Sequence, residues 1–220
     1  MSNKVYFPNL NGIRAIAAFM VIIHHIGQFL GIFDMPNALD TKVIHFIGPL
    51  GVTLFFVLSG FLITYLLLAE EKSTGTIALK DFYIRRILRI WPLYYIIILA
   101  SFFILPYIKI LALPDGYWKP FSENFYFYLS LFLLFLPNIV LFRYGAVLPY
   151  GSQSWSVGVE EQFYLLWPIL MKFVKNKVIL IIGVIGLYVC MYVCMYVCMW
   201  IGKNRRGSSY QSFYRFFSNL

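Results

Sequence analysis

The stretch N-G-I-R-A-I-A-A-F-M-V-I-I-H-H-I-G-Q-F-L, residues 11–30, decides the fold of this chain. A helix of about 20 apolar residues, rising about 1.5 Å per residue, crosses a hydrocarbon core of about 30 Å. The stretch therefore predicts a transmembrane helix, although it contains Arg14, His24 and His25. Ionisable side chains are costly inside a bilayer, and by default they indicate a functional site there.

Helix geometry separates the two histidines. Eleven steps of about 100° bring His25 to within about 20° of Arg14, whereas His24 lies about 80° from that line. Arg14 and His25 therefore share a face, about 16 Å apart along the axis, and His25 is expected near the middle of the membrane. The alternative is a helix with a snorkelling arginine and two packed histidines.

Composition excludes a soluble domain. Of the 220 residues, 61% are hydrophobic and only 12% are charged, which indicates an all-α polytopic membrane bundle in contact with lipid. The net charge of +9 comes from a few local basic residues, a pattern typical of membrane topology rather than of nucleic-acid binding. Cys190, Cys194 and Cys198 lie on one helical stripe without His, Asp or Glu, so we expect no metal site there.

Apolar runs predict five or six spans within a single domain over residues 1–220. We place the spans at residues 11–32, 43–69, 87–106, 125–142, 155–174 and 178–201. The loop at residues 70–89 has five basic residues and the link at 34–42 has one, so the positive-inside rule predicts a cytoplasmic N-terminus. The segment 155–174 ends in lysines that simple alternation places outside, and a re-entrant segment is the alternative.

Several residues in these runs have two interpretations. Ser59 and Gly60 are small residues that let membrane helices approach closely, and Ser59 is also a candidate pocket residue. Trp91, Tyr94 and Tyr95 near the start of the third run are expected to be interfacial anchors.

Two charged groups accompany His25. Arg86 and Arg89 are three residues apart, which places two guanidinium groups on one side of a helix, where they suit a phosphate group or anionic lipid. Glu160 and Glu161 cannot both face lipid, and either one could orient His25 as a general base.

The residues just before the two glutamates are candidates for binding an acceptor. Ser154 and Ser156 have hydroxyls that can donate hydrogen bonds to a carbonyl or a sugar, and Trp155 can stack on a sugar face. The alternative is an ordinary interfacial loop with a tryptophan anchor.

Four strings, in this order, resemble the acyltransferase 3 family of integral membrane O-acyltransferases. They are L-N-G-I-R-A-I-A-A followed by His25, G-V-T-L-F-F-V-L-S-G-F-L-I, F-Y-I-R-R-I-L-R-I-W-P-L-Y-Y and Q-S-W-S-V-G-V-E-E-Q-F-Y-L-L-W-P. The resemblance covers about residues 6–168. It implies transfer of an acyl group, usually acetyl from acetyl-CoA as co-substrate with no bound cofactor, to a hydroxyl of a cell-surface glycan.

The resemblance also implies roles for individual residues and a location. His25 corresponds to the catalytic histidine, Arg14 to its partner on the first helix, and Glu160 to the glutamate of the S-W-S motif. Arg86 and Arg89 correspond to the pair linked to the acyl donor. The expected location is the bacterial inner membrane.

Two other functions fit the same charged residues. In a transporter of a glycan or lipid-linked substrate they would line a pathway without covalent chemistry. In a truncated remnant, or in one half of a split enzyme with a separate C-terminal half, these residues would form only part of a site. Because family members usually have about ten spans, we expect the 220 residues alone to be inactive.

Overall fold

A computed structural model describes residues 9–32, 35–111, 121–145, 147–148 and 150–176, with residues 178 and 182. Within these residues every regular element is a helix, which confirms the predicted all-α fold. The predicted span at 178–201, apart from its residues 178 and 182, lies outside the described residues, as do the three cysteines.

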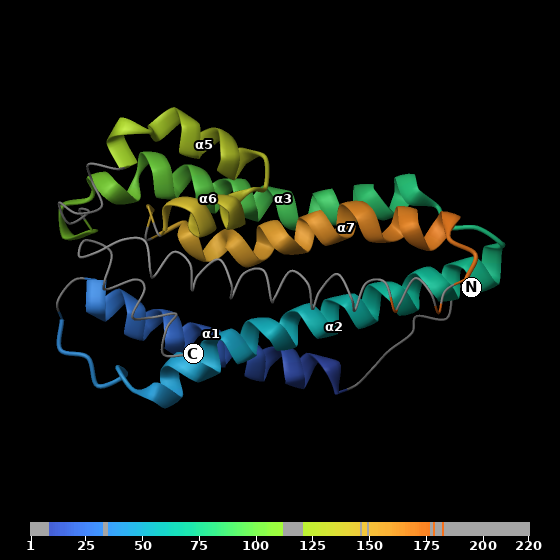
Figure 1. The fold of residues 1–220 in the computed structure, drawn as a ribbon, viewed down its shortest axis with the longest axis horizontal. Helices are drawn as coiled ribbons and strands as arrows, with labels where there is room; N and C mark the ends of the chain where they lie inside the picture. Colours follow the sequence, from blue (N-terminus) through green and yellow to red (C-terminus); the bar gives the residue numbers. More distant parts are fainter. Residues whose placement is uncertain are drawn as a thin grey trace. The chain divides into compact units, whose positions relative to one another are not determined.

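Six α-helices and three short 3-10 turns have defined bounds (Figure 1). The α-helices are α1 (Leu10–Ile32), α2 (Lys42–Thr74), α3 (Leu79–Phe103), α5 (Phe125–Leu133), α6 (Pro137–Tyr144) and α7 (Trp155–Phe173). The 3-10 turns are η1 (Leu105–Tyr107), η2 (Lys109–Leu111) and η3 (Ser152–Ser154).

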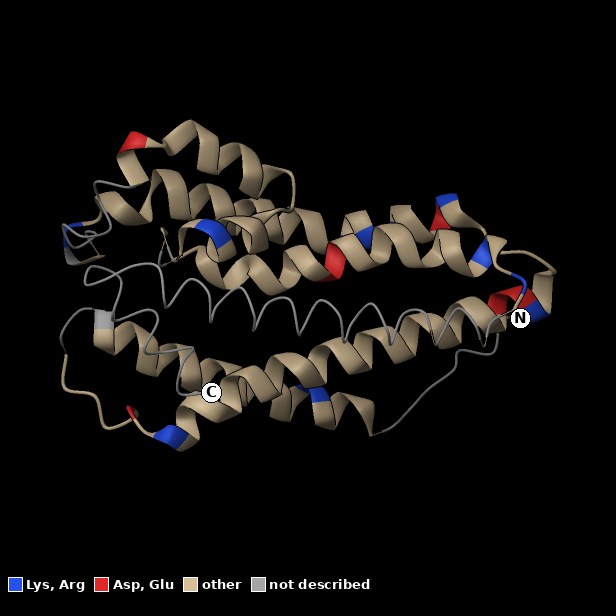
Figure 2. Cartoon of the chain, in the orientation of Figure 1, with Lys and Arg blue, Asp and Glu red and all other residues tan. Residues whose placement is uncertain are grey.

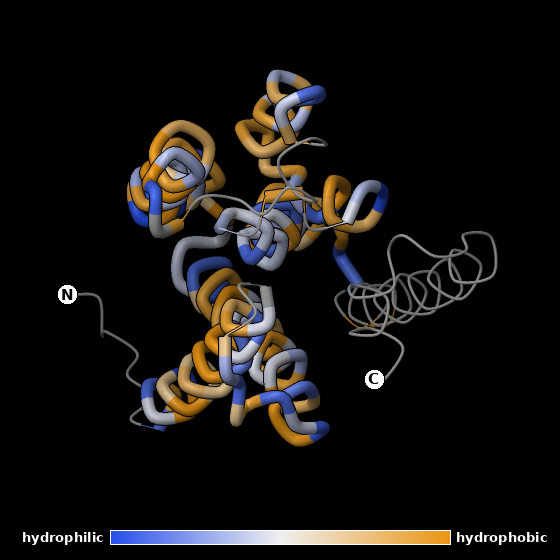
Figure 3. The backbone as a smooth tube through the Cα atoms, turned by 90° about the vertical axis from the view of Figure 1, so that its left-hand side faces the viewer, coloured by the Kyte–Doolittle hydropathy of each residue, from blue (hydrophilic) through white to orange (hydrophobic). Residues whose placement is uncertain are grey.

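Three of the described helices are long and apolar enough to cross a membrane, namely those that begin at Leu10, Lys42 and Leu79. Few charged positions interrupt the helices (Figure 2), and hydrophobic residues dominate them (Figure 3). The helix α7 has 19 residues but carries Glu160, Glu161 and Lys172, which lower its apolar character. The chain is an integral membrane protein.

The chain divides into two compact units, and α2 runs from the first into the second. The first unit covers Met1–Leu66 with Ser218–Leu220, and the second covers Leu67–Phe217. Within the first unit, α1 and α2 approach each other at two glycines of α2. A Cβ on Gly48 would lie 2.2 Å from the ring of His24, and one on Gly51 would lie 2.8 Å from a backbone oxygen of α1. Only hydrogen atoms at these positions permit the contact.

Close packing therefore occurs at a different place from the one that the sequence indicated. A Cβ on Gly60 would meet no heavy atom within 4 Å, whereas Gly48 and Gly51, at the start of the same helix, have no space for one. Small residues predict that a close contact is possible, but they do not identify which pair makes it.

In the second unit, α3 and α7 lie side by side and antiparallel. The Tyr83 hydroxyl donates a hydrogen bond to the Leu165 carbonyl at 2.7 Å. Lys172 Nζ, at the far end of α7, donates to the Ile77 carbonyl at 3.1 Å, just before α3 begins. As residue numbers rise along α3, those of the contacting residues fall along α7.

The region predicted as a span at 125–142 is two short helices instead of one. The helices α5 and α6 are separated by residues 134–136, where Phe135 has φ 58°. The Leu136 amide bonds to the Leu131 carbonyl at 2.9 Å, which closes the end of α5 as a left-handed C-terminal cap. A left-handed conformation is an outlier for so bulky a residue as phenylalanine.

The third helix extends eight residues beyond the N-terminal end of the predicted span at 87–106. The helix α3 starts at Leu79, so Trp91 is twelve residues from either end of it. Trp91 and Tyr95 are therefore half-buried in the middle of the helix, and Tyr94 is buried there. These three aromatic residues pack within the second unit, and their role as interfacial anchors stays a prediction.

Aromatic residues form the core of the second unit. Phe102 is fully buried, and its ring contacts those of Phe121 and Phe132 at centroid distances of 5.6 and 5.3 Å. The core joins α3, α5, α6 and the segment before η3. Its buried members are Tyr94, Ile98, Phe102, Phe121, Tyr128, Phe132, Phe135, Val140, Val147 and Leu148.

Candidate functional site

The candidate site residues belong to both units, and each unit is described separately. His24, His25, Arg14 and Ser59 lie in the first unit. The other candidates lie in the second unit, and they are Arg86, Arg89, Ser154, Trp155, Ser156 and Glu160.

His24 is a packed histidine at the contact between α1 and α2. Its side chain is only 5% exposed and lies against Gly48. His24 Nδ1 is 3.0 Å from the carbonyl oxygen of Ile44. Because a carbonyl only accepts, Nδ1 must carry the hydrogen and donate. The interpretation of His24 as a packed residue therefore fits the structure.

His25 has different surroundings from its neighbour. Its ring is half-buried and meets the His24 ring edge-on at a centroid distance of 5.6 Å. Arg14, also half-buried, lies eleven residues earlier on the same regular helix. The catalytic role of His25 stays a prediction.

A third histidine near this pair was not expected from the sequence. The His45 ring meets the His24 ring at a centroid distance of 6.2 Å, and His45 Nε2 is 2.7 Å from Asp40 Oδ1. No periodicity links His45 to α1, because the contact depends on how the two helices pack. Three histidines and one carboxylate of the first unit are thus connected by contacts. His25 contacts His24, His24 contacts His45, and His45 contacts Asp40.

Ser59 lies on α2 within the first unit and is half-buried. It is fifteen residues beyond Ile44, whose carbonyl accepts the hydrogen bond of His24. This separation corresponds to about 22 Å of helix. The structure therefore does not bring Ser59 to the histidine cluster, and its role as a pocket residue stays a prediction.

In the second unit, Arg86 lies between aromatic rings. Its guanidinium carbon is 5.4 Å from the centroid of Phe82 and 5.2 Å from that of Tyr164 on α7. The Tyr164 hydroxyl donates a hydrogen bond to Glu160. Cation–π contacts of this kind each contribute about 0.5–2 kcal/mol and fix the arginine in place. Arg86, Tyr164 and Glu160 therefore form one connected group.

The two arginines of the predicted donor-binding pair are in different environments. Arg86 is half-buried against α7, whereas Arg89 is exposed, as is Arg85. Three residues in a helix correspond to about 300°, so a neighbouring helix that covers Arg86 need not cover Arg89. The pair is on one side of α3, but its members are not equivalent.

Glu161 has its own partner on α3. Trp91 Nε1 donates to Glu161 Oε2 at 3.1 Å, and Glu161 Oε1 is buried with no hydrogen-bond partner among the described residues. The Trp91 ring in turn packs against Phe135, with centroids 5.2 Å apart. Adjacent carboxylates therefore have separate partners, Tyr164 for Glu160 and Trp91 for Glu161.

The hydroxyls of the S-W-S segment donate hydrogen bonds to backbone carbonyls three residues earlier in the chain. Ser154 Oγ donates to the Gly151 carbonyl at 2.6 Å, and Ser156 Oγ donates to the Gln153 carbonyl at 3.4 Å. The hydroxyl oxygens still have acceptor capacity, but donation to a ligand would require the hydroxyls to rotate. Trp155, between them, is half-buried.

These helices and groups define a class, an integral membrane protein with histidine, carboxylate and arginine side chains within its helices. The acyltransferase domain family matches residues 7–216, which is nearly the whole chain. The chain belongs to this family, the acyltransferase 3 family that the four sequence strings resemble.

Two similar proteins are named as O-acetyltransferases. The peptidoglycan O-acetyltransferase OatA of Listeria monocytogenes is 34% identical over 194 residues, which cover 84% of this chain and 28% of that protein. The O-acetyltransferase OatA of Staphylococcus aureus strain NCTC 8325 is 33% identical over 182 residues, which cover 80% of this chain and 26% of that protein. The chain thus spans about a quarter of the length of these relatives. No solved structure matches the chain.

Proposed function

We propose that the chain acts in membrane O-acyl transfer, in which an acetyl group moves from acetyl-CoA to a hydroxyl of a cell-wall glycan. The observation that carries the proposal is the family match over residues 7–216, because these residues include every candidate site residue. The relatives' names supply the reaction type and the glycan class.

His25 is the proposed centre of the chemistry. As a general base, it takes the proton of the acceptor hydroxyl, whose oxygen attacks the thioester carbon while the carbon–sulfur bond breaks and the CoA thiolate leaves. As a nucleophile, it carries the acetyl group itself and then passes it to the acceptor. Glu160 is proposed as the second catalytic residue, and Arg14 as the partner of His25.

Positive charge supports a binding site for the donor. Arg86 and Arg89 are proposed to bind the phosphates of acetyl-CoA, since guanidinium groups match phosphate oxygens in geometry and charge. The ring contacts of Arg86 hold its side chain in a defined position before any ligand binds. The acceptor is proposed to contact Ser154, Trp155 and Ser156, and Ser59 is a further candidate.

The proposed location is the bacterial cytoplasmic membrane with a cytoplasmic N-terminus. Basic residues of the loop before α3 and of α3 itself would then face the cytoplasm, where acetyl-CoA is present. The acceptor would be on the opposite side of the membrane.

The test compares native cells with and without the gene. Mild alkali releases O-acetyl groups from purified cell-wall glycan, and we expect the amount of acetate to fall in the deletion strain. The full-length wild-type gene should restore it, and the same gene with the His25→Ala substitution should not. An unchanged acetate content in the deletion strain would overturn the proposal. Label from [¹⁴C]acetyl-CoA in the glycan would distinguish transfer from transport of a substrate that is already acetylated.

A further inference from the structure

The helices α5 and α6 form an antiparallel hairpin beside α3. At its open end, the Tyr144 ring of α6 contacts the rings of Phe127 and Tyr128 of α5, with centroids 5.7 and 5.5 Å apart. The helices have 9 and 8 residues, so each is only about 12–14 Å long. Neither can cross a hydrocarbon core of about 30 Å by itself.

The hairpin starts at one end of α3 and reaches its middle. Phe125, at the start of α5, packs against Phe103, the last residue of α3, with centroids 5.4 Å apart. Phe135, at the tip, stacks on Tyr94 at 4.3 Å and contacts Trp91 at 5.2 Å. Trp91 is twelve residues from both ends of α3, or about 18 Å. The tip is therefore halfway along the helix.

Protein side chains satisfy the backbone at the tip. The hydroxyls of Tyr94 and Tyr95 donate to the carbonyls of Phe132 and Leu133 at 2.7 and 3.2 Å. Gln162 Nε2 of α7 donates to the Phe135 carbonyl at 3.0 Å. Non-helical backbone is tolerated at membrane depth only where protein or water provides such partners, and both neighbouring helices provide them here.

The helix α6 is also fixed to α7. Asn138 and Gln162 exchange hydrogen bonds between their side-chain amides, at 3.3 and 3.0 Å. A Cβ on Gly158 would lie 2.8 Å from the ring of Pro137 at the start of α6, so the two helices touch there. The hairpin tip is thus held on both sides at the depth of Trp91 and Glu161.

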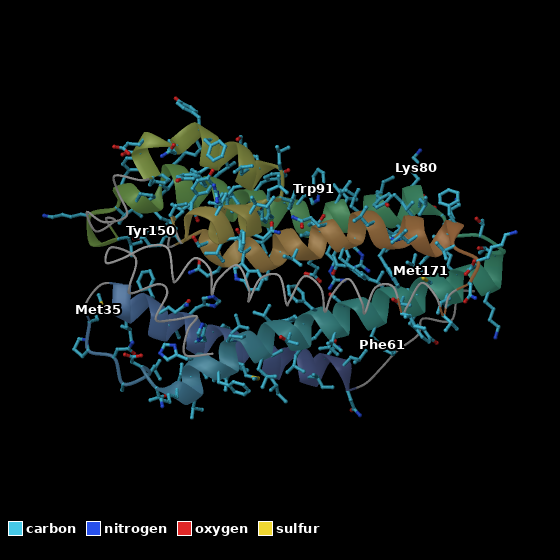
Figure 4. The ribbon with its side chains drawn as sticks, viewed as in Figure 1. Met35, Phe61, Lys80, Trp91, Tyr150 and Met171 are labelled. Atoms are coloured by element: carbon cyan, nitrogen blue, oxygen red, sulfur yellow. The ribbon has the colours of Figure 1, made fainter. Side chains whose placement is uncertain are left out.

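The opposite end of the second unit is basic. Lys172 at the end of α7 reaches Ile77, next to Lys80 and the arginines of α3. Figure 4 shows Lys80 and Met171 at one end of the unit, Tyr150 at the other, and Trp91 between them. If residues 125–142 crossed the membrane, simple alternation would place Lys172 on the side opposite Lys80. The antiparallel α3 and α7 place both lysines at the same end.

We propose that α5 and α6 are a re-entrant hairpin that enters the membrane from the end opposite the basic residues, turns back at the level of Trp91 and leaves from the same side. The helix α7 then crosses toward the basic end, which removes the conflict between its lysines and the positive-inside rule. If the chain acts in O-acyl transfer as proposed, the S-W-S segment at the start of α7 faces the side of the glycan acceptor.

Cysteine labelling tests the proposal without any assay of activity. Cys190, Cys194 and Cys198 are first replaced by serine, and single cysteines are then introduced at exposed positions on both sides of the hairpin and at the basic end. The variants are Glu123→Cys, Arg143→Cys, Lys80→Cys and Lys175→Cys. A membrane-impermeant maleimide is added to intact spheroplasts and, in parallel, to permeabilised ones, and labelling after denaturation gives the total.

We expect the four cysteines to behave as two pairs, with equal labelling within each pair. Cysteines at 123 and 143 label to the same extent in intact spheroplasts, and those at 80 and 175 both label only after permeabilisation. Opposite behaviour of 123 and 143, or of 80 and 175, would overturn the proposal. Both comparisons hold for either orientation of the N-terminus. A failed labelling pattern would leave the functional proposal intact, and unchanged glycan acetylation in the deletion strain would leave the hairpin intact.

Discussion

Adjacent histidines on α1 have different roles in packing. His24 fills the space beside Gly48, and its Nδ1 hydrogen bond holds α1 against α2. His25 is one helical step of about 100° away, where it is half-buried and meets the His24 ring edge-on. The sequence grouped His25, and not His24, with Arg14; the packing of His24 fits that grouping, and the catalytic role of His25 stays a prediction.

This difference predicts separate effects of two alanine variants. The His25→Ala variant should abolish restoration of glycan acetylation in the deletion strain, with an unchanged amount of protein in the membrane. The His24→Ala variant should retain part of the acetylation and lower the thermal stability of the detergent-solubilised protein, because it loses a buried ring and a hydrogen bond, about 1–3 kcal/mol together. Equal loss of acetylation in both variants at normal protein levels would contradict the facial argument.

The arginines of α3 give a second prediction at this scale. Arg86→Gln and Arg89→Gln should each weaken acetyl-CoA binding by roughly 1.5–3 kcal/mol, the loss expected for a charge-assisted hydrogen bond to phosphate. Isothermal titration of the solubilised protein measures this change. Arg85→Gln is the matched control, because Arg85 is also exposed and cationic on the same helix. If all three variants bind acetyl-CoA like the wild type, the arginines serve as contacts for anionic lipid instead.

At the scale of elements, the turn at Phe135 explains why α5 and α6 are separate helices. Its left-handed backbone is unfavourable for a bulky residue, by about 1–2 kcal/mol. The ring compensates because it packs among Trp91, Tyr94 and Tyr95, with centroid distances of 5.2, 4.3 and 5.5 Å. Glycine would suit the backbone, and phenylalanine suits the site between the helices.

An unusual order of stability follows for variants at this turn. Phe135→Ala loses the ring but keeps the backbone strain, and removal of a buried phenylalanine costs about 3–5 kcal/mol. Phe135→Gly loses the same ring but relieves the strain, so it should be about 1 kcal/mol more stable than the alanine variant. Thermal unfolding in detergent gives the comparison.

The control for this order is an exposed phenylalanine within α5. Phe127 is 47% exposed at the third position of α5, and glycine in a helix is less favourable than alanine by up to about 1 kcal/mol. Phe127→Gly should therefore be less stable than Phe127→Ala, the reverse of the order at position 135. The same order at both positions would show that the left-handed turn does not contribute to stability.

The sequence predicted some elements well because their signals are local. The apolar run with its polar flanks placed α1 at residues 11–32, and the helix is Leu10–Ile32. The helix α3 also includes residues before the predicted span at 87–106, because Arg85, Arg86 and Arg89 fit a helix as well as a loop. The break before α6 had a signal in Pro137, since the residue before a proline is disfavoured in a helix, and Leu136 has φ −114° and ψ 30°.

The contacts of the candidate site could not be predicted in the same way. Trp91 and Glu161 are 70 residues apart, and the Tyr83 hydroxyl and Leu165 carbonyl are 82 apart. Such pairs depend on which faces of α3 and α7 meet, and an apolar sequence pattern does not specify this when both helices are apolar on most sides. The sequence therefore named candidate residues for the site, but not their partners.

At the scale of the whole molecule, charge defines two chemically different ends of the second unit. Lys80, Arg85 and Lys172 lie at or near the end where α3 begins, and Glu160 and Glu161 lie toward the middle of the unit. A donor with several phosphates is attracted to the basic end, and this attraction decreases with ionic strength. In the proposal, the glycan acceptor uses the opposite end of the unit. The proposed reaction thus has a direction across the membrane.

This direction predicts a dependence on the side to which acetyl-CoA is added. Acetyl-CoA is too highly charged to cross a bilayer, so it reaches only the face to which it is added. Inverted vesicles from native cells should incorporate [¹⁴C]acetyl from external acetyl-CoA into glycan, and right-side-out vesicles should do so only after permeabilisation. Vesicles from the deletion strain give the background. Incorporation by sealed right-side-out vesicles above that background would place the donor site on the outer face, and the proposed cytoplasmic position of Arg86 and Arg89 as the acetyl-CoA site would then be wrong.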